Sequence, residues 1–313
     1  MDRLEGWGYE VIEALQRGRT PVFDGLAGFL SFLGDEPFYL ILIPVLYWGV
    51  DRALALRLTV LLMVSTWVNG AFKGLVDLPR PSPDRVDVLV HYDSGGVPSG
   101  HAQNALVVWG FLVSRRPVAL ALVAAALLVI LISASRVYLG VHFPHDLVAG
   151  WLLGGLLLAA VLRWGPEMAR WVDAAPLGPV LALALGIPAL MLLVHRDFEA
   201  LPAAATLLGA AGGAVWERRR LRFDAGGDGR RRVLRVTVGL AVALAIWAGL
   251  RMPLASFGDP GRIFRYALLG AWLTALAPWF FVRVGWAGRE GGRPGGVAGS
   301  SSAGADPDSA RPG

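Results

Sequence analysis

Three short segments in the middle of the chain combine basic residues, histidines and an acid at fixed spacings. They are KGLVDLPRP (73–81), PSGH (98–101) and SRVYLGVHFPHD (135–146). A phosphoryl group in transfer spreads negative charge over its oxygens, so cations placed around it stabilise the transition state. Lys73, Arg80 and Arg136 could supply that charge, although each could also be an anchor at a membrane surface. The three segments together favour phosphoryl chemistry.

His142 and Asp146 have the spacing of a nucleophile and its partner. They are four residues apart, and Pro144 suits the first turn of a following helix. An imidazole that attacks phosphorus needs one nitrogen free and the other bonded to a group that fixes its tautomer, which a carboxylate does. Two interfacial histidines that merely contact lipid headgroups are the alternative.

The PSGH segment opens an apolar helix. The first turn of a helix has free backbone N–H groups that bind anions, and Gly100 lets the backbone approach a phosphate closely. Ser99 alone would be interpreted as an ordinary N-cap. His101 follows directly, so we expect Ser99 and Gly100 to bind phosphate beside it.

The elements that must position these residues are membrane helices. The chain has 313 residues, 55% of them hydrophobic and 17% charged, and a mean hydropathy of +0.54. These values predict an all-α, polytopic transmembrane helical bundle. The expected spans are 37–50, 53–76, 101–113, 117–135, 146–163, 177–195, 200–216, 233–250 and 263–284. The first is weakest, because it is short and contains Pro44, so it could lean on 22–34 or be re-entrant.

Loop charges predict the orientation of this bundle. Alternate connections are rich in arginine, above all 217–232, and these should face the cytoplasm. The same reasoning assigns that cluster to a solvated loop rather than to a nucleic-acid site. The arginine-poor connections, which contain the three segments above, should face the extracytoplasmic side of the cell membrane.

At this point the chain resembles the type 2 phosphatidic acid phosphatase family, which shares a helical core with vanadium haloperoxidases. The family pattern K-x6-R-P, P-S-G-H and S-R-x5-H-x3-D is met at every fixed position. The resemblance implies a phosphatase/haloperoxidase-like core in which His142 is the nucleophile, Asp146 orients it and His101 protonates the leaving alkoxide. It implies phosphate binding by Lys73, Arg80, Ser99, Gly100 and Arg136.

The expected function is metal-independent hydrolysis of a phosphomonoester or pyrophosphate on a membrane lipid through a phosphohistidine, at the outer interface. A lipid phosphotransferase using the same site and a non-catalytic lipid-phosphate binding or transport protein stay open as alternatives. A haloperoxidase is disfavoured, because those relatives are soluble. No histidines and acids show the ligand spacing of a motif such as H-E-x-x-H, so we expect no metal and no cofactor.

The predicted organisation has four parts. Residues 1–36 form an N-terminal amphipathic, interfacial segment, 37–165 the catalytic core, 166–288 additional C-terminal transmembrane helices, and 289–313 a disordered tail. The resemblance covers roughly 37–165 and assigns no role to the helices that follow. The expected partners are the lipid bilayer and a lipid phosphate.

Overall fold

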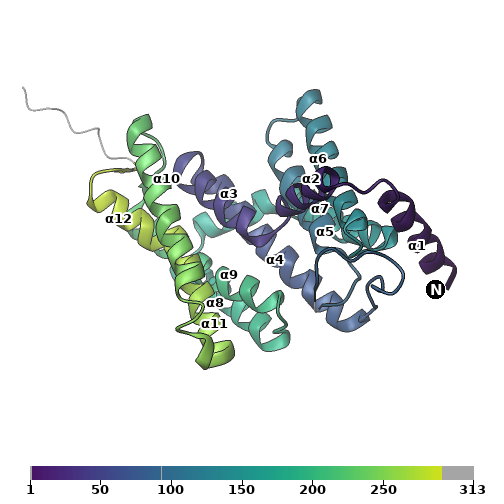
Figure 1. Ribbon diagram of the computed structural model, residues 1–313. Helices are drawn as coiled ribbons and strands as arrows, with labels where there is room; N and C mark the ends of the chain where they lie inside the picture. The colour runs from purple at the N-terminus through teal and green to yellow at the C-terminus, as the bar shows by residue number, and fades with distance from the viewer. Residues whose placement is uncertain (1, 93, 291–313) are drawn as a thin grey trace, which may run out of the picture.

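The computed structural model describes residues 2–92 and 94–290 as a helical protein (Figure 1). Its α-helices are α1 (Asp2–Gln16), α2 (Pro21–Phe32), α3 (Glu36–Gly49), α4 (Arg52–Val76), α5 (Gly100–Ser114), α6 (Ala119–Tyr138), α7 (Pro144–Ala174), α8 (Leu177–Val194), α9 (Ala200–Trp216), α10 (Gly229–Leu244), α11 (Gly258–Ala271) and α12 (Ala277–Arg283). Shorter elements are η1 (Glu217–Leu221), η2 (Ala245–Gly249), η3 (Ala255–Phe257), η4 (Trp272–Leu276), β1 (Phe223–Asp224) and β2 (Gly288–Arg289). The predicted all-α transmembrane class is confirmed, with one short antiparallel β1–β2 pair added.

Each predicted span coincides with helix. Six helical stretches of the described chain are long and apolar enough to cross a membrane, and the bent pair α2–α3 would make seven. Helices α5 and α9, with 15 and 17 residues, are shorter. At 1.5 Å per residue α5 extends over about 22 Å, less than the hydrocarbon thickness.

The weakest predicted span, 37–50, is one half of a broken helix. Helices α2 and α3 meet at an angle of 50°. Thr20 caps the start of α2 by accepting from the Phe23 N–H, and Asp35 is the N-cap of α3. Because of the break, Asp35 precedes the first turn of α3 instead of lying inside a continuous helix. Its carboxylate can therefore contact a neighbouring residue.

The predicted core is built around α5. Helix α5 packs against α6 on one side and α7 on the other, and α4 crosses it. The crossing with α7 is close because a Cβ at Gly150 would lie 2.6 Å from the Ser99 carbonyl oxygen, and one at Gly154 would lie 2.8 Å from that of Gln103. Small residues of this kind let membrane helices approach closely. They hold the start of α7 against the start of α5.

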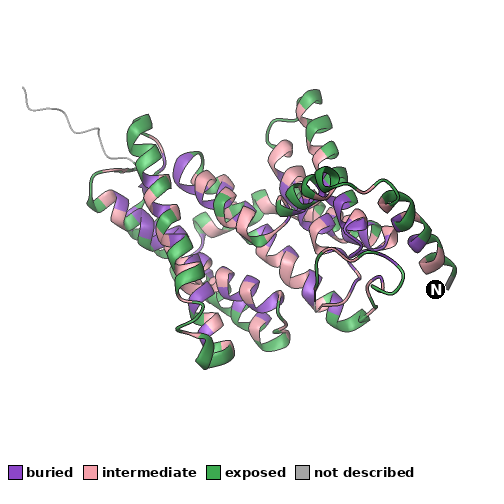
Figure 2. Ribbon diagram, viewed as in Figure 1, coloured by how far each residue is buried: buried purple, intermediate pink, exposed green. Residues whose placement is uncertain are grey.

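The C-terminal helices form a second group beside α3 and α4 (Figure 1). Helices α9 and α11 cross closely, since a Cβ at Gly209 or Gly270 would collide with the backbone of the other helix. The Trp48 indole N–H of α3 donates to the Leu273 carbonyl oxygen at 2.9 Å and ties the two groups together. Exposed residues lie along the outer faces of both groups (Figure 2), and many are apolar, such as Leu152, Leu156 and Leu193.

The arginine-rich connections gather at one end of the bundle. Arg52 pairs with Glu217 at 2.6 Å and with Glu290 at 3.0 Å, while Arg218 contacts Asp173. The β1–β2 pair lies at the same end. The predicted tail began at 289, but residues 289 and 290 make these contacts, and the rest of it, 291–313, lies outside the described residues.

Helix α1 packs on the opposite end of the core. Tyr9 and Ile12 are buried in a cluster with Val86, Val137 and Phe143. The Tyr9 hydroxyl accepts from the Ser82 N–H at 3.0 Å. Tyr9 and Ile12 of this amphipathic helix therefore cover protein, whereas Leu4, Trp7 and Leu15 are exposed, and its predicted place at a membrane interface stays a prediction. Helix α7 runs without a break across the predicted 165/166 boundary.

Candidate active site

The three sequence segments converge on one cavity of about 740 Å³. Six predicted site residues line it, namely Lys73, Arg80, Gly100, His101, Arg136 and His142. The other two, Ser99 and Asp146, are fully buried next to it, and the Ser99 N–H donates to the Asp146 carbonyl oxygen at 3.0 Å. The structure thus brings all eight predicted residues together from α4, α5, α6, α7 and the loops between them.

His142 is held by both of its ring nitrogens. Its Nδ1 lies 3.1 Å from Asp146 Oδ2, which also accepts from the Phe143 N–H at 2.9 Å. Its Nε2 lies 3.1 Å from Arg80 Nη1, a permanent donor. This network assigns the proton to Nδ1 and the free electron pair to Nε2. His142 is 2% exposed, so this tautomer is fixed by its surroundings.

The charges around His142 keep its ring neutral. Burial first, and then the positive charges of Arg80 and Arg136, lower the pKa of His142 well below the usual 6.5. A neutral imidazole is the form that can act as a nucleophile. The arrangement therefore provides at neutral pH the protonation state that attack on phosphorus needs.

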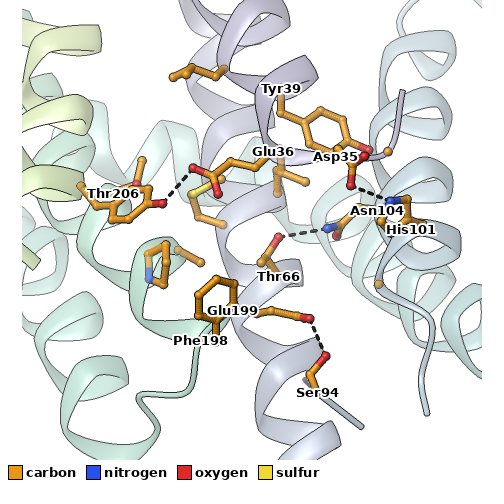
Figure 3. Close-up of a pocket in the computed structure, with 18 of the residues that line it drawn as sticks. Asp35, Glu36, Tyr39, Thr66, Ser94, His101, Asn104, Phe198, Glu199 and Thr206 are labelled. Carbon is orange, nitrogen blue, oxygen red and sulfur yellow. Dashed lines mark hydrogen bonds and ion pairs between the residues drawn. The ribbon is translucent and has the colours of Figure 1, made fainter. Parts of the chain in front are cut away.

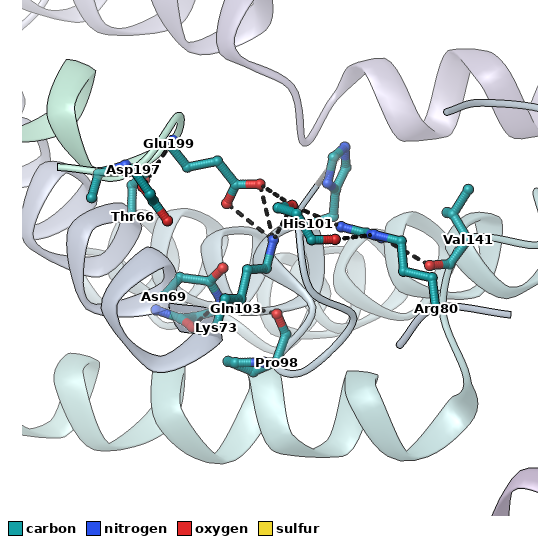
Figure 4. Close-up of polar contacts among 12 residues, drawn as sticks. Thr66, Asn69, Lys73, Arg80, Pro98, His101, Gln103, Val141, Asp197 and Glu199 are labelled. Atoms are coloured by element: carbon teal, nitrogen blue, oxygen red, sulfur yellow. Dashed lines mark hydrogen bonds and ion pairs between the residues drawn. The ribbon is translucent and has the colours of Figure 1, made fainter. Parts of the chain in front are cut away.

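Arg80 and Arg136 both lie against the ring of Tyr92. Each guanidinium carbon lies 4.9 Å from the centroid of the Tyr92 ring. Arg80 also donates to the Ser94 carbonyl oxygen at 2.7 Å and to the Val141 carbonyl oxygen at 2.8 Å (Figure 4). Backbone and aromatic contacts of this kind immobilise the guanidinium planes before any ligand arrives.

Lys73 is paired with a carboxylate from the C-terminal helices. Its ammonium donates to both Glu199 carboxylate oxygens, at 2.9 and 3.0 Å (Figure 4). The Ser94 hydroxyl donates to the same carboxylate at 2.9 Å. Although burial opposes ionisation, the Lys73 ammonium lowers the pKa of Glu199. A negative charge thus lies against Lys73, one of the predicted phosphate-binding cations.

The PSG turn has the geometry of an anion site. Helix α5 begins at Gly100. The first backbone hydrogen bond at its start runs from the Gln103 N–H to the Ser99 carbonyl oxygen. The preceding N–H groups are those that a helix leaves free at its start. The Ser99 hydroxyl makes no capping bond and has no hydrogen-bond partner among the described residues.

His101 forms a second histidine–aspartate pair. Its Nε2 lies 2.9 Å from Asp35 Oδ1 (Figure 3). Ser31, from the end of α2, contacts Arg136 and lies 3.5 Å from His101 Nε2. The Asp35 contact leaves Nδ1 as the nitrogen that can exchange a proton.

Five residues of the site were not found from the sequence. Ser31, Asp35, Tyr92, Ser94 and Glu199 all contact predicted site residues. These residues carry little signal in the sequence, because single serines and acids in loops are common. The break between α2 and α3 was the one available signal for Asp35.

Groups of three or more histidine, aspartate or glutamate side chains that could hold a metal ion were not found in the part of the chain that the structure describes. His145 lies 3.3 Å from Asp146 Oδ1 and stacks on Phe143. The expectation of a metal-free site stays a prediction.

Comparison with known proteins now adds family membership. Residues 54–170 match the model of the PAP2 superfamily, and residues 201–289 match that of the PAP2 superfamily phosphatase, transmembrane extension. Phosphatidylglycerophosphatase B of Bacillus subtilis (strain 168) is 31% identical over 166 residues, covering 49% of this chain and 80% of that protein. The chain belongs to the PAP2 superfamily. The resemblance to type 2 phosphatidic acid phosphatases is thereby confirmed.

Other PAP2 relatives are longer. Lipid phosphate phosphatase delta of Arabidopsis thaliana is 32% identical over 189 residues, 53% of this chain and 44% of that protein. The chain spans less than half the length of the first curated relatives that it matches. The crystal structure of a transmembrane PAP2-type phosphatidylglycerolphosphate phosphatase from Bacillus subtilis is 26% identical, with a TM-score of 0.47, and the match covers 53% of this chain and 88% of that one.

Proposed function

We propose that this chain is a membrane phosphatase that hydrolyses a phosphomonoester or pyrophosphate on a lipid, through a phosphohistidine at His142. The observation that carries the proposal is the His142 tautomer, with Nδ1 on Asp146 and Nε2 beside Arg80 at the cavity. The names of the relatives, a lipid phosphate phosphatase and a phosphatidylglycerophosphatase, support the substrate class.

The reaction takes two steps. His142 Nε2 attacks phosphorus, the bond from phosphorus to the lipid oxygen breaks, and the leaving oxygen takes a proton from His101 Nδ1. Water then attacks the phosphohistidine, giving a proton back to His101, and the P–N bond breaks to release inorganic phosphate. Asp146 stabilises the charge that develops on His142, and Arg80, Arg136 and Lys73 neutralise the phosphoryl oxygens.

The position of the site supports an interfacial reaction. Lys73 lies in the last turn of α4, whereas Arg52 of the arginine-rich end begins the same helix, and the positive-inside rule assigns the arginine-rich end to the cytoplasm. On this proposal the lipid phosphate is bound at the extracytoplasmic surface of the cell membrane while its chain stays in an apolar environment.

The test uses purified protein and phosphate release from a panel of phosphatidic acid, phosphatidylglycerol phosphate, a sphingoid-base phosphate and a polyprenyl pyrophosphate. We expect release with EDTA present, and an acid-labile phosphoenzyme with a ³²P-labelled substrate. His142→Ala should abolish both, whereas His195→Ala, outside the predicted catalytic set, should retain both. Turnover by His142→Ala, or loss of activity in EDTA with recovery on adding a divalent ion, would contradict the proposal.

A further inference from the structure

The cavity that contains the candidate active site extends well beyond it. Its lining passes from Lys73 and His142 to residues of α3, α4, α9, α11 and η4, as far as Trp48. Figure 3 shows Glu36 of α3, Thr66 of α4 and Thr206 of α9 around the same cavity. Volumes of ~300–1,000 Å³ are typical of small-molecule sites, and this cavity falls within that range. We call the part lined by α3, α4, α9, α11 and η4 the apolar arm.

One face of α4 connects the two parts. Thr59, Leu62, Met63 and Thr66 line the cavity, and Lys73 follows on the same helix. These positions recur at intervals of three and four, which places them on one side of a helix. Thr59 and Lys73 are fourteen residues apart, or about 21 Å along the helix axis. The apolar arm is therefore long and has a cation at one end.

A matching face of α9 lies opposite. Pro202, Ala203 and Thr206 line the cavity at helical spacing below Glu199. The Lys73–Glu199 ion pair joins the two faces at the phosphate end. Leu269 and Leu273 complete the apolar arm from α11 and η4. The C-terminal helices thus provide a wall of the cavity, although the catalytic residues are all in the core.

Several polar groups of the apolar arm are bonded within the protein, whereas the Tyr39 hydroxyl has no hydrogen-bond partner among the described residues. The Glu36 carboxylate accepts from the Trp247 indole N–H at 2.6 Å and from the Tyr266 hydroxyl at 3.0 Å. The Asn104 side-chain amide donates to the Thr66 hydroxyl at 3.0 Å. Paired groups of this kind make no demand on a ligand for hydrogen bonds. What remains for a ligand to contact is mostly hydrocarbon.

We propose that the apolar arm holds the hydrocarbon chain of the phosphate-bearing lipid, and that α9 and α11 thereby set the chain length that is turned over. This inference rests on the proposed function. The occupant follows from continuity, because a single cavity has three cations at one end and apolar side chains along the other. A ligand with an anionic head and one long chain matches both parts.

Binding in the apolar arm fixes the position of the lipid's hydrocarbon chain but adds little binding affinity. A hydrocarbon chain in the bilayer is already in an apolar solvent, so moving it into the cavity yields little transfer free energy. Fixing the chain also fixes the phosphate relative to His142, and a displacement of ~1 Å at a reacting centre can cost ~100-fold in rate. The effect should therefore appear in kcat/KM.

The test compares hexadecyl phosphate with butyl phosphate in the same detergent. Thr206→Phe should obstruct the apolar arm and lower kcat/KM for hexadecyl phosphate about tenfold, with butyl phosphate turnover kept as proof of folding. Leu208→Phe, on the same helix but outside the cavity lining, should change neither. An equal loss on both substrates, or an unchanged rate with hexadecyl phosphate, would overturn the assignment.

A second measurement needs no turnover. A hexadecyl phosphate with a diazirine at the chain end should cross-link the wild-type protein at Leu273 or its neighbours in η4 and α9. Labelling at the exposed Leu152 and Leu156 of α7 would reject the apolar arm. Protein that hydrolyses no substrate but cross-links in η4 would refute the proposed function and leave the binding site standing. Hydrolysis of both substrates together with labelling on α7 would support the proposed function and reject the apolar arm as the site of the hydrocarbon chain.

Discussion

At the scale of single residues, the site consists of two histidine–aspartate pairs on either side of a cluster of cations. His142 with Asp146 is local in sequence, whereas His101 with Asp35 joins residues 66 positions apart. The two pairs suit different tasks. In the first, burial and the surrounding arginines keep the imidazole neutral; in the second, the Asp35 carboxylate lies against Nε2 and leaves Nδ1 as the nitrogen that can exchange a proton.

The general-acid role proposed for His101 predicts a dependence on the leaving group. His101→Ala should lose about 10²–10⁴-fold with an alkyl phosphate, and much less with p-nitrophenyl phosphate, whose leaving group needs little protonation. Asp35→Asn should show the same pattern in weaker form. Parallel kcat/KM measurements on both substrates check this. Equal losses on the two substrates would remove His101 from that role.

The pKa of His142 predicts how the site responds to acid. Because the folded-state pKa is depressed below 6.5, the neutral ring persists below that pH and is lost only as the pH falls through the depressed value. NMR of the His142 ring, assigned with His142→Ala, should give a midpoint below 6.5. Arg80→Gln should move this midpoint upward by removing a cation. A midpoint at or above 6.5 in the wild type would contradict the argument.

The negative charge of Glu199 beside Lys73 predicts how a Glu199→Gln variant should respond to an anion. Removing its charge in Glu199→Gln leaves Lys73 buried without a counter-ion, which should lower the unfolding free energy by about 1–3 kcal/mol. The same change removes repulsion of a bound anion, so vanadate inhibition should strengthen about tenfold. Thermal unfolding with and without vanadate measures both effects. Glu167→Gln, in an exposed pair with Arg163, is the control, and matching behaviour of the two variants would dismiss the idea.

At the scale of elements, the crossing of α5 and α7 positions the chemistry. Gly150→Ala would place a Cβ 2.6 Å from the Ser99 carbonyl oxygen, so the two helices must separate at the phosphate-binding turn. We expect kcat/KM to fall by about tenfold or more. Gly155→Ala, whose Cβ would meet a Leu106 side chain at 3.8 Å, should behave as wild type. A normal rate in Gly150→Ala would show that this crossing is not critical.

At the scale of the whole molecule, the bundle has two chemically different ends. One carries the site with α1, and the other joins Arg52, Glu217 and Glu290. The C-terminal helices reach both ends, through Glu199 and through β2. They therefore contribute to the candidate active site and to the packing of the bundle, rather than forming a separate unit beside it.

The orientation of these ends can be tested by labelling. The chain has no native cysteine, so Asp84→Cys and Arg231→Cys, both at exposed positions, report one end each. In intact cells an impermeant maleimide should label residue 84, and residue 231 only after permeabilisation. Ser94, in the loop before PSGH, is not used as a labelling site, because its hydroxyl contacts Arg80 and Glu199 in the candidate active site. The opposite labelling pattern would reverse the proposed orientation.

The helical elements, and the eight residues that the structure brings together at the cavity, could be predicted from the sequence alone. Both depend on local information: apolar runs long enough to cross a membrane, and motifs such as Lys73 with Arg80 or His142 with Asp146, whose members lie within one segment. The local charge of the loops also predicts that the site lies at the end of the bundle opposite the arginine-rich connections.

The groups that surround these residues could not be predicted, because they come from distant parts of the chain and meet only in the folded protein. Asp35 reaches His101 through the break between α2 and α3, and Glu199 reaches Lys73 across 126 positions of sequence. No local period records such pairs, because they depend on how helices cross and where each ends. For the same reason the apolar arm was invisible in the sequence: its walls are faces of α4, α9 and α11, and a cavity exists only once those faces oppose one another.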